Sequence, residues 1–237
     1  MLPTVVILCG GRGTRLQEHT RSIPKPLVEI GGRPILWHVI QIYLAQRFRR
    51  FILLTGYKAA MIEKFVRSEQ WPDRTDIRCL ETGPDTPTGG RLRRAAGVID
   101  GEPFCLTYAD GVADVDLHAL LAQHGAHGKQ ATMTVVRPEL QFGIAELNGD
   151  GQVRGFVEKP RSEHWINGGF FCFEPSVLKL LRDDDVLERR PLSELAAGGQ
   201  LRAFRHEGFW DCMDTYKDAV LLNDLWASGQ APWKLWD

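Results

Sequence analysis

The chain has 237 residues, of which 43% are hydrophobic, and a formal net charge of −1 at pH 7. This length suffices for one large domain with a complete core, and the near-neutral charge excludes the positive field that binding to nucleic acid or an anionic membrane requires. With no apolar run near the roughly 18 residues of a membrane span, and no signal peptide before the first strand, we expect a cytoplasmic protein. The five cysteines are scattered and expected to be reduced thiols.

The first half of the chain alternates short apolar runs with helical patterns. Strands are predicted at 3–9, 51–54 and 104–108, and helices around 35–43 and 61–66. Helices between short, continuous apolar strands indicate crossover connections and a mainly parallel sheet. Ligands bind at the carboxyl ends of the strands in such sheets, and there we expect a glycine-rich loop and Asp110 to lie.

The second half has a different pattern, with closely spaced strands. These are predicted at 131–136, 142–147 and 152–157, followed by helices near 175–181, 189–198 and 215–227 and a strand near 201–205. The segment 148–151, Asn-Gly-Asp-Gly, is a strong hairpin-turn signal. Because no linker separates the halves, we expect one α/β domain over 1–237: a Rossmann-like, mainly parallel mixed sheet flanked by helices, with a small antiparallel subregion.

A glycine-rich segment with two arginines, Gly10-Gly11-Arg12-Gly13-Thr14-Arg15, directly follows the first predicted strand, and Lys25 comes ten residues later between two prolines. Glycines let backbone N–H groups approach an anion, and arginines add forked donors. The segment lacks the final lysine of a Walker loop and the third glycine of a dinucleotide fingerprint. We therefore expect another kind of phosphate site, in which Arg15 and Lys25 supply the positive charge.

These segments resemble the opening motif of the sugar-1-phosphate nucleotidyltransferases and, within that family, the glucose-1-phosphate cytidylyltransferases. The likeness covers nearly the whole chain and includes the segments 31–38, 88–92, 108–114, 158–160, 166–171, 208–215 and 231–234. It implies a GT-A-like nucleotidyltransferase fold. Residues of about 1–130 would form the nucleotide-binding half, and residues 131–237 the sugar-phosphate-binding half and the C-terminal helix.

The resemblance implies that a sugar 1-phosphate, most closely glucose 1-phosphate, attacks the α-phosphorus of CTP with the help of Mg²⁺, giving a CDP-sugar and pyrophosphate. Asp110 follows an apolar strand and precedes a glycine, a position that suits an oxygen ligand of Mg²⁺. Asp214 taken alone has the pattern of an N-cap for the last helix, but the resemblance makes it the second metal ligand. Asp114 and Asp116 are expected to be loop and helix-cap residues.

The nucleotide would bind between the glycine-rich segment and the segment that begins at Thr88. The residues implied are Leu8, Gly10, Gly11, Gly13, Thr14, Arg15, Lys25, Thr88, Gly89, Arg91 and Asp110. In the family, Lys25 would lie near the α-phosphorus and Arg15 on the β- and γ-phosphates. A guanidinium aimed at O2 and N3 of cytosine would meet only acceptors, so Arg91 would favour CTP. Thr88 could equally be no more than an N-cap.

The sugar 1-phosphate would bind to residues from later in the chain. The residues implied are Tyr108, Glu158, Lys159, Asn167, Gly168 and Gly169, and the catalytic set is Arg15, Lys25 and Lys159. Lys159 would hold the phosphate of the sugar, so that two lysines reduce the repulsion between two anionic substrates.

Other functions stay open at this stage. The same chemistry could use UTP, dTTP or GTP, or another sugar or polyol phosphate. A non-catalytic nucleotide or nucleotide-sugar sensor would keep the loop, but it would not need both aspartates and both lysines. Substrates are the expected partners, without nucleic acid or membrane, and a homo-oligomer is expected. The aromatic tail (Trp226, Trp233 and Trp236) would pack on a neighbour or on its own core.

Overall fold

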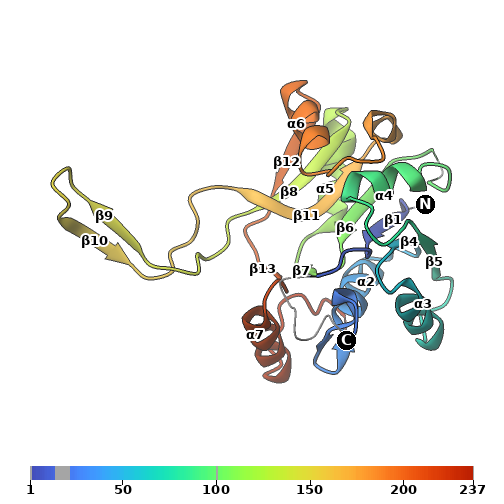
Figure 1. The fold of residues 1–237 in the computed structure, drawn as a ribbon, viewed down its shortest axis with the longest axis horizontal. Helices are drawn as coiled ribbons and strands as arrows, with labels where there is room; N and C mark the ends of the chain where they lie inside the picture. Colours follow the sequence, from blue (N-terminus) through green and yellow to red (C-terminus); the bar gives the residue numbers. More distant parts are fainter. Residues whose placement is uncertain (1, 14–21, 100, 237) are drawn as a thin grey trace.

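A mixed sheet of seven strands forms the centre of the protein (Figure 1). The structure is a computed structural model that describes residues 2–13, 22–99 and 101–236. In order across the sheet, the strands are β12 (Leu201–Arg205), β8 (Ala131–Val136), β11 (Ile166–Phe173), β6 (Phe104–Tyr108), β1 (Val5–Leu8), β4 (Arg50–Thr55) and β5 (Asp76–Glu81). Strand β11 runs antiparallel to β6 and β8, and the other neighbouring pairs are parallel. The expected mainly parallel mixed sheet is confirmed.

Helices cover both faces of this sheet. One face packs against α2 (Ile35–Ala45), α3 (Ala59–Ser68), α5 (Leu117–His127) and α7 (Tyr216–Ala227), and the other against α4 (Thr88–Ala95), the 3₁₀ helix η3 (Pro175–Leu180) and α6 (Arg190–Ala197). Within β1, Val5 and Ile7 belong to the first core and Val6 and Leu8 to the second. Burial on both faces explains why this strand is apolar without alternation.

The predicted elements are found close to their expected bounds, with one change of type. The helix expected near 175–181 is the 3₁₀ helix η3, with Pro175 at its first position. The helical segment has only six residues, starting at Pro175 and ending before the extended, buried Leu181, and short helical segments of this kind often form 3₁₀ turns. Strands β5 and β11 were not among the predicted elements, and helix α5 was anticipated only by the expected helix cap Asp116, which is its N-cap.

Within the described residues, three small antiparallel pairs accompany the central sheet. They are β2 (Glu29–Ile30) with β3 (Arg33–Pro34), β7 (Gly111–Ala113) with β13 (Trp210–Cys212), and β9 (Ile144–Leu147) with β10 (Val153–Val157). The β9–β10 pair is the expected hairpin, and Asn148 Oδ1 accepts a hydrogen bond of 2.7 Å from the Gln152 backbone N–H across its turn. Figure 1 shows this hairpin projecting far from the sheet. Its side chains consequently have little of the molecule to pack against.

The aromatic tail packs on the protein's own core. Trp233 is fully buried, and its indole N–H donates a 3.3 Å hydrogen bond to Nδ1 of His38 on α2. The rings of Trp226 and Trp236 also contact the His38 ring. Burial lowers the pKa of His38 to about 4, so this ring is neutral at pH 7. None of the helices in the described part of the chain has the length and apolar character needed to cross a membrane.

Candidate active site

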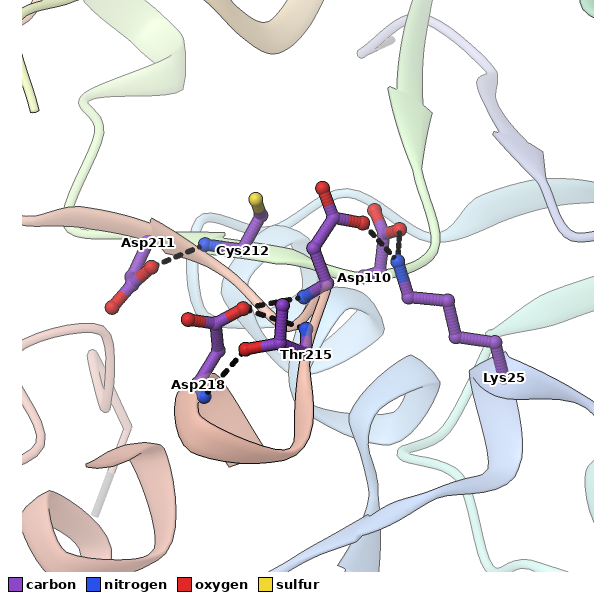
Figure 2. Close-up of polar contacts among 7 residues, drawn as sticks. Lys25, Asp110, Asp211, Cys212, Thr215 and Asp218 are labelled. Atoms are coloured by element: carbon purple, nitrogen blue, oxygen red, sulfur yellow. Dashed lines mark hydrogen bonds and ion pairs between the residues drawn. The ribbon is translucent and has the colours of Figure 1, made fainter. Parts of the chain in front are cut away.

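Three charged side chains meet at the carboxyl-end edge of the sheet. Lys25 Nζ lies 2.6 Å from Oδ2 of Asp110 and 2.6 Å from Oδ1 of Asp214. Figure 2 shows the Lys25 side chain extending from its own segment toward Asp110. The two carboxylates therefore converge on one position, which the Lys25 ammonium occupies.

Local pairing of short strands brings the two aspartates together. Asp110 lies between β6 and β7, and Asp214 lies two residues after the end of β13, which pairs with β7. The backbone N–H of Met213 donates to the Asp110 carbonyl at 2.9 Å and closes the junction. This pairing explains why residues distant in the sequence form one acidic pair.

Asp214 is not the N-cap of the last helix. The N-cap of α7 is Thr215, whose side chain and that of Asp218 form a reciprocal capping box, visible in Figure 2. The Asp218 carboxylate also accepts a 3.0 Å hydrogen bond from the Asp214 backbone N–H. Because neighbouring residues cap the helix, the Asp214 carboxylate can face Lys25.

Lys25 begins the short 3₁₀ helix η2 (Lys25–Leu27), and its side chain is only 12% exposed. Burial by itself would lower the pKa of Lys25, but Asp110 and Asp214 outweigh it and raise the pKa above the ordinary value. The lysine is therefore a fixed positive charge at neutral pH. One ammonium between two carboxylates leaves the cluster with a net negative charge.

Two cavities open on either side of this cluster. The first, of about 400 Å³, is lined by Leu8, Cys9, Gly10, Gly11, Gly13, Lys25, Pro26, Thr86, Pro87, Thr88, Arg91, Tyr108, Ala109, Asp110 and Val186. The second, of about 330 Å³, is lined by Thr107, Tyr108, Asp110, Gly111, Ile166, Asn167, Gly168, Gly169, Trp210, Cys212 and Asp214. Tyr108 and Asp110 belong to both linings. Most of the described residues expected for the nucleotide line the first cavity, and Tyr108, Asn167, Gly168 and Gly169, expected for the sugar phosphate, line the adjoining second one.

Arg91 is buried beneath the first cavity and already has acceptors within the protein. Its guanidinium donates to the carbonyls of Gly10, Thr55 and Gly83 at 2.8–2.9 Å and to the Thr82 hydroxyl at 2.7 Å. A Cβ on Gly10 would lie 2.0 Å from the guanidinium carbon, which explains the glycine. The structure therefore holds the guanidinium under the loop as a brace, with its N–H groups donating to protein acceptors at the wall of the first cavity.

The segment at Thr88 is held by the loop before α6. Thr88 is the first residue of α4 and follows the N-cap Pro87, so it is not the cap itself. The backbone N–H groups of Gly89 and Gly90 donate to the Asp185 carbonyl at 2.9 and 3.1 Å. Side chains at these glycines would overlap the backbone at Asp185 and at Asp183, respectively. Both glycines are explained by this packing, and Gly89 does not line the first cavity.

Hydrogen bonds also order the second cavity. Asn167 donates to the Tyr108 hydroxyl at 3.1 Å and accepts a 2.9 Å hydrogen bond from the Gly169 N–H. Gly169 has φ of +86°, and a Cβ there would lie 2.8 Å from the Tyr108 ring. The indole N–H of Trp210 donates to the Gly168 carbonyl at 2.7 Å. Asn167, Gly168 and Gly169 are thereby fixed beside Tyr108.

Some of the expected site residues are not brought to these cavities. Glu158 and Lys159 follow β10 at the base of the projecting hairpin, where both are exposed, and neither lines either cavity. Lys159 has φ of +45°, which is unusual for a residue with a side chain. Thr14 and Arg15 lie outside the described residues.

Sequence reasoning also missed several residues that line the cavities. Thr86, Pro87 and Val186 line the first cavity, and Ile166 and Cys212 line the second. Thr86 and Pro87 immediately precede the segment that begins at Thr88, so a motif extended by two residues includes them. Val186 lies on a loop with no signal in the sequence.

Comparisons with known proteins agree with this geometry. A family model described as nucleotidyl transferase matches residues 4–200. The chain is 43% identical to a glucose-1-phosphate cytidylyltransferase of Salmonella typhimurium (98% of this chain, 99% of the relative) and 42% identical to a probable one of Bacillus subtilis, with the same coverage. The crystal structure of HddC from Yersinia pseudotuberculosis superimposes with a TM-score of 0.76 at 23% identity, covering 95% of this chain and all of that one. The chain belongs to the nucleotidyl transferase family.

Proposed function

We propose that this enzyme joins glucose 1-phosphate to CTP, giving CDP-glucose and pyrophosphate. The observation that carries the proposal is the pair of cavities that meet at Tyr108 and Asp110, beside the cluster of Lys25, Asp110 and Asp214. Relatives at 42–43% identity, matched over 98% of this chain, are named as glucose-1-phosphate cytidylyltransferases, the second as a probable one. The nucleotide would occupy the first cavity and the sugar 1-phosphate the second.

In this arrangement the reacting atoms would lie where the cavities join. A phosphate oxygen of the sugar 1-phosphate would attack the α-phosphorus of CTP, and pyrophosphate would leave on the opposite side. Phosphoryl and nucleotidyl transfers depend mainly on positioning and on neutralising charge. Lys25, fixed by two carboxylates, would supply positive charge near the α-phosphorus.

We propose Mg²⁺ as the cofactor, held by Asp110 and Asp214. Their converging oxygens suit a hard cation. The described residues contain no group of three histidine, cysteine or acidic side chains that could hold a metal with protein ligands alone. Two carboxylates completed by substrate phosphates and water are a usual set of ligands for Mg²⁺, whereas structural zinc needs more protein ligands. When bound, the ion would neutralise phosphate charge.

The remaining catalytic roles are proposed from the family resemblance. Arg15 would hold the β- and γ-phosphates of CTP. Lys159 would reach the phosphate of the sugar, for which the hairpin base would have to lie closer to the second cavity. Asn167 and Tyr108, already ordered beside that cavity, would contact the sugar hydroxyls.

The proposal is tested by measuring pyrophosphate release with Mg²⁺ for CTP, UTP, dTTP and GTP, each against glucose 1-phosphate, mannose 1-phosphate and a polyol phosphate. Release that is fastest with CTP and glucose 1-phosphate supports it. Release with another pair would keep the chemistry and change the substrates. Binding of CTP without release from any pair would favour a nucleotide sensor.

We also propose that the enzyme is a homo-oligomer of the cytoplasm, where nucleoside triphosphates are made. The support for an oligomer is the β9–β10 hairpin, on which Leu147 and Phe156 are each 64% exposed, together with Phe142, two residues before β9, which is 79% exposed. A two-stranded hairpin with large exposed apolar side chains is marginally stable by itself, and a second copy would cover them. Sedimentation should show the wild type as an oligomer and Phe156→Ser as a smaller species. A monomeric wild type would contradict this assembly.

A further inference from the structure

Glu188 lies on the loop between η3 and α6, outside every motif that the sequence singled out. Its carboxylate accepts one hydrogen bond from each cavity. Thr88 of the first cavity donates through its hydroxyl at 2.7 Å to Oε2, and Tyr108, which borders both cavities, donates at 2.5 Å to Oε1. A single side chain thus spans the two linings.

The hydrogen bonds continue from Glu188 in both directions. On one side, the Thr88 hydroxyl accepts a 2.8 Å hydrogen bond from the Leu187 N–H. On the other, the Tyr108 hydroxyl accepts from Asn167 Nδ2, and Asn167 Oδ1 accepts from the Gly169 N–H. The chain of contacts therefore runs from the start of α4 to β11.

This chain has a defined direction because Glu188 can only accept. The ionised carboxylate requires Thr88 and Tyr108 to donate, so the Tyr108 oxygen is left to accept from the Asn167 amide. Glu188 consequently holds the Tyr108 hydroxyl in the orientation in which its oxygen accepts from Asn167.

We propose that Glu188 is a positioning residue, which sets the nucleotide cavity through Thr88 and the sugar-phosphate cavity through Tyr108. This inference rests on the proposed function, because it takes the two cavities as the sites of the two substrates. An exposed carboxylate beside anionic substrates is electrostatically unfavourable, and two hydroxyl donors offset that cost. Glu188 acts on both substrates without touching the reacting atoms.

The first test compares Glu188→Ala, Glu188→Gln and a control, Asp184→Ala, which removes an exposed carboxylate from the same loop. Glu188→Ala should raise the KM of both substrates about tenfold, the usual size for losing a hydrogen bond to a charged group. Glu188→Gln should recover part of the loss, because its amide oxygen still accepts one hydrogen bond. Asp184→Ala should keep both KM values.

Combined variants separate positioning from general loop packing. In a Tyr108→Phe background, Glu188→Ala should still raise the KM for CTP but should no longer change that for the sugar phosphate. In a Thr88→Val background, Glu188→Ala should still raise the KM for the sugar phosphate but should no longer change that for CTP. The two branches of the hydrogen-bond chain predict this crossed pattern.

Two results would overturn the proposal. One is equal KM values for Glu188→Ala and wild type. The other is that Glu188→Ala raises the KM of both substrates equally in every background and also lowers the melting temperature. This result would mean that Glu188 only packs the loop. If the wild type releases no pyrophosphate with any pair, the proposed function fails instead. Calorimetric titration of CTP then decides on Glu188, since Glu188→Ala should weaken CTP binding in the wild-type background and leave it unchanged in Thr88→Val.

Discussion

Asp110 and Asp214, from distant parts of the sequence, each place one carboxylate oxygen 2.6 Å from the same atom, Nζ of Lys25. The β7–β13 pairing makes this convergence a property of the fold. Three charges so close are electrostatically coupled, so replacing any one of them changes the other two. The first two predictions use this coupling.

Asp110→Asn should abolish most turnover while leaving the fold intact. The amide keeps the shape of the side chain but removes a charge that the reaction needs, and losses of about 100-fold or more are typical of such electrostatic groups. The measurement is the initial rate of pyrophosphate release together with a thermal melt. Asp73→Asn, at an exposed position far from the site in sequence, is the control. A rate near that of the wild type would remove Asp110 from the proposed cation site.

Lys25→Met should make the protein depend more strongly on Mg²⁺ for stability. Without the ammonium, the two negatively charged carboxylates face each other and repel, which destabilises the fold. A divalent cation between them would relieve this repulsion. The melting temperature at pH 8 should therefore rise more with added Mg²⁺ in the variant than in the wild type. An equal or smaller rise would contradict the idea that both carboxylates share one cation.

Arg91→Ala should reduce stability and weaken binding of every nucleoside triphosphate by a similar factor. Its guanidinium serves several buried acceptors, and leaving them unpaired costs about 3 kcal/mol or more. The loop at Gly10, which Arg91 braces, would then lose its shape for any phosphate. KM values for CTP, UTP and GTP, with a thermal melt, check this. A loss confined to CTP would instead mean that Arg91 contacts the base.

His38 should make the protein less stable as the pH falls from about 6.5 to about 4. Its pKa is lowered to about 4 in the folded protein, so the unfolded chain binds a proton that the folded one does not. Above the pKa of His38 in the unfolded chain, this effect costs no stability. As the pH falls from there to about 4, the free energy of unfolding decreases by about 3 kcal/mol. Urea unfolding followed by tryptophan fluorescence should show a smaller acid loss for His38→Gln than for wild type. Identical pH dependence would exclude His38 as the cause.

Much of the fold could be predicted because its signals are local. Strand β1 is a continuous apolar run buried on both faces, and the turn at 148–151 carries the residues that a hairpin needs. Strand β5 was missed since it lies at the edge of the sheet and is only partly buried, so charged residues interrupt its apolar ones. Helix α5 was missed because its apolar stripe is weak and contains histidines and a glycine.

The site was harder to predict wherever tertiary contacts decide the role of a side chain. Local patterns drew attention to Lys25 and Asp110 and family resemblance to Asp214, and the structure brings these three together. Arg91 was expected to face the ligand, but the sequence cannot reveal that carbonyls from three other segments surround it. Glu188 had no signal at all, since its partners are about 80 and 100 residues away.

The most direct test of the account follows the phosphates of CTP through the reaction. CTP labelled at the α-phosphorus and CTP labelled at the γ-phosphorus are each incubated with glucose 1-phosphate and Mg²⁺. All α-label should enter CDP-glucose and all γ-label should enter pyrophosphate, and Asp110→Asn should suppress both. The γ-label appearing as inorganic phosphate, or the α-label remaining in CDP or CMP without sugar, would contradict transfer at the junction of the two cavities.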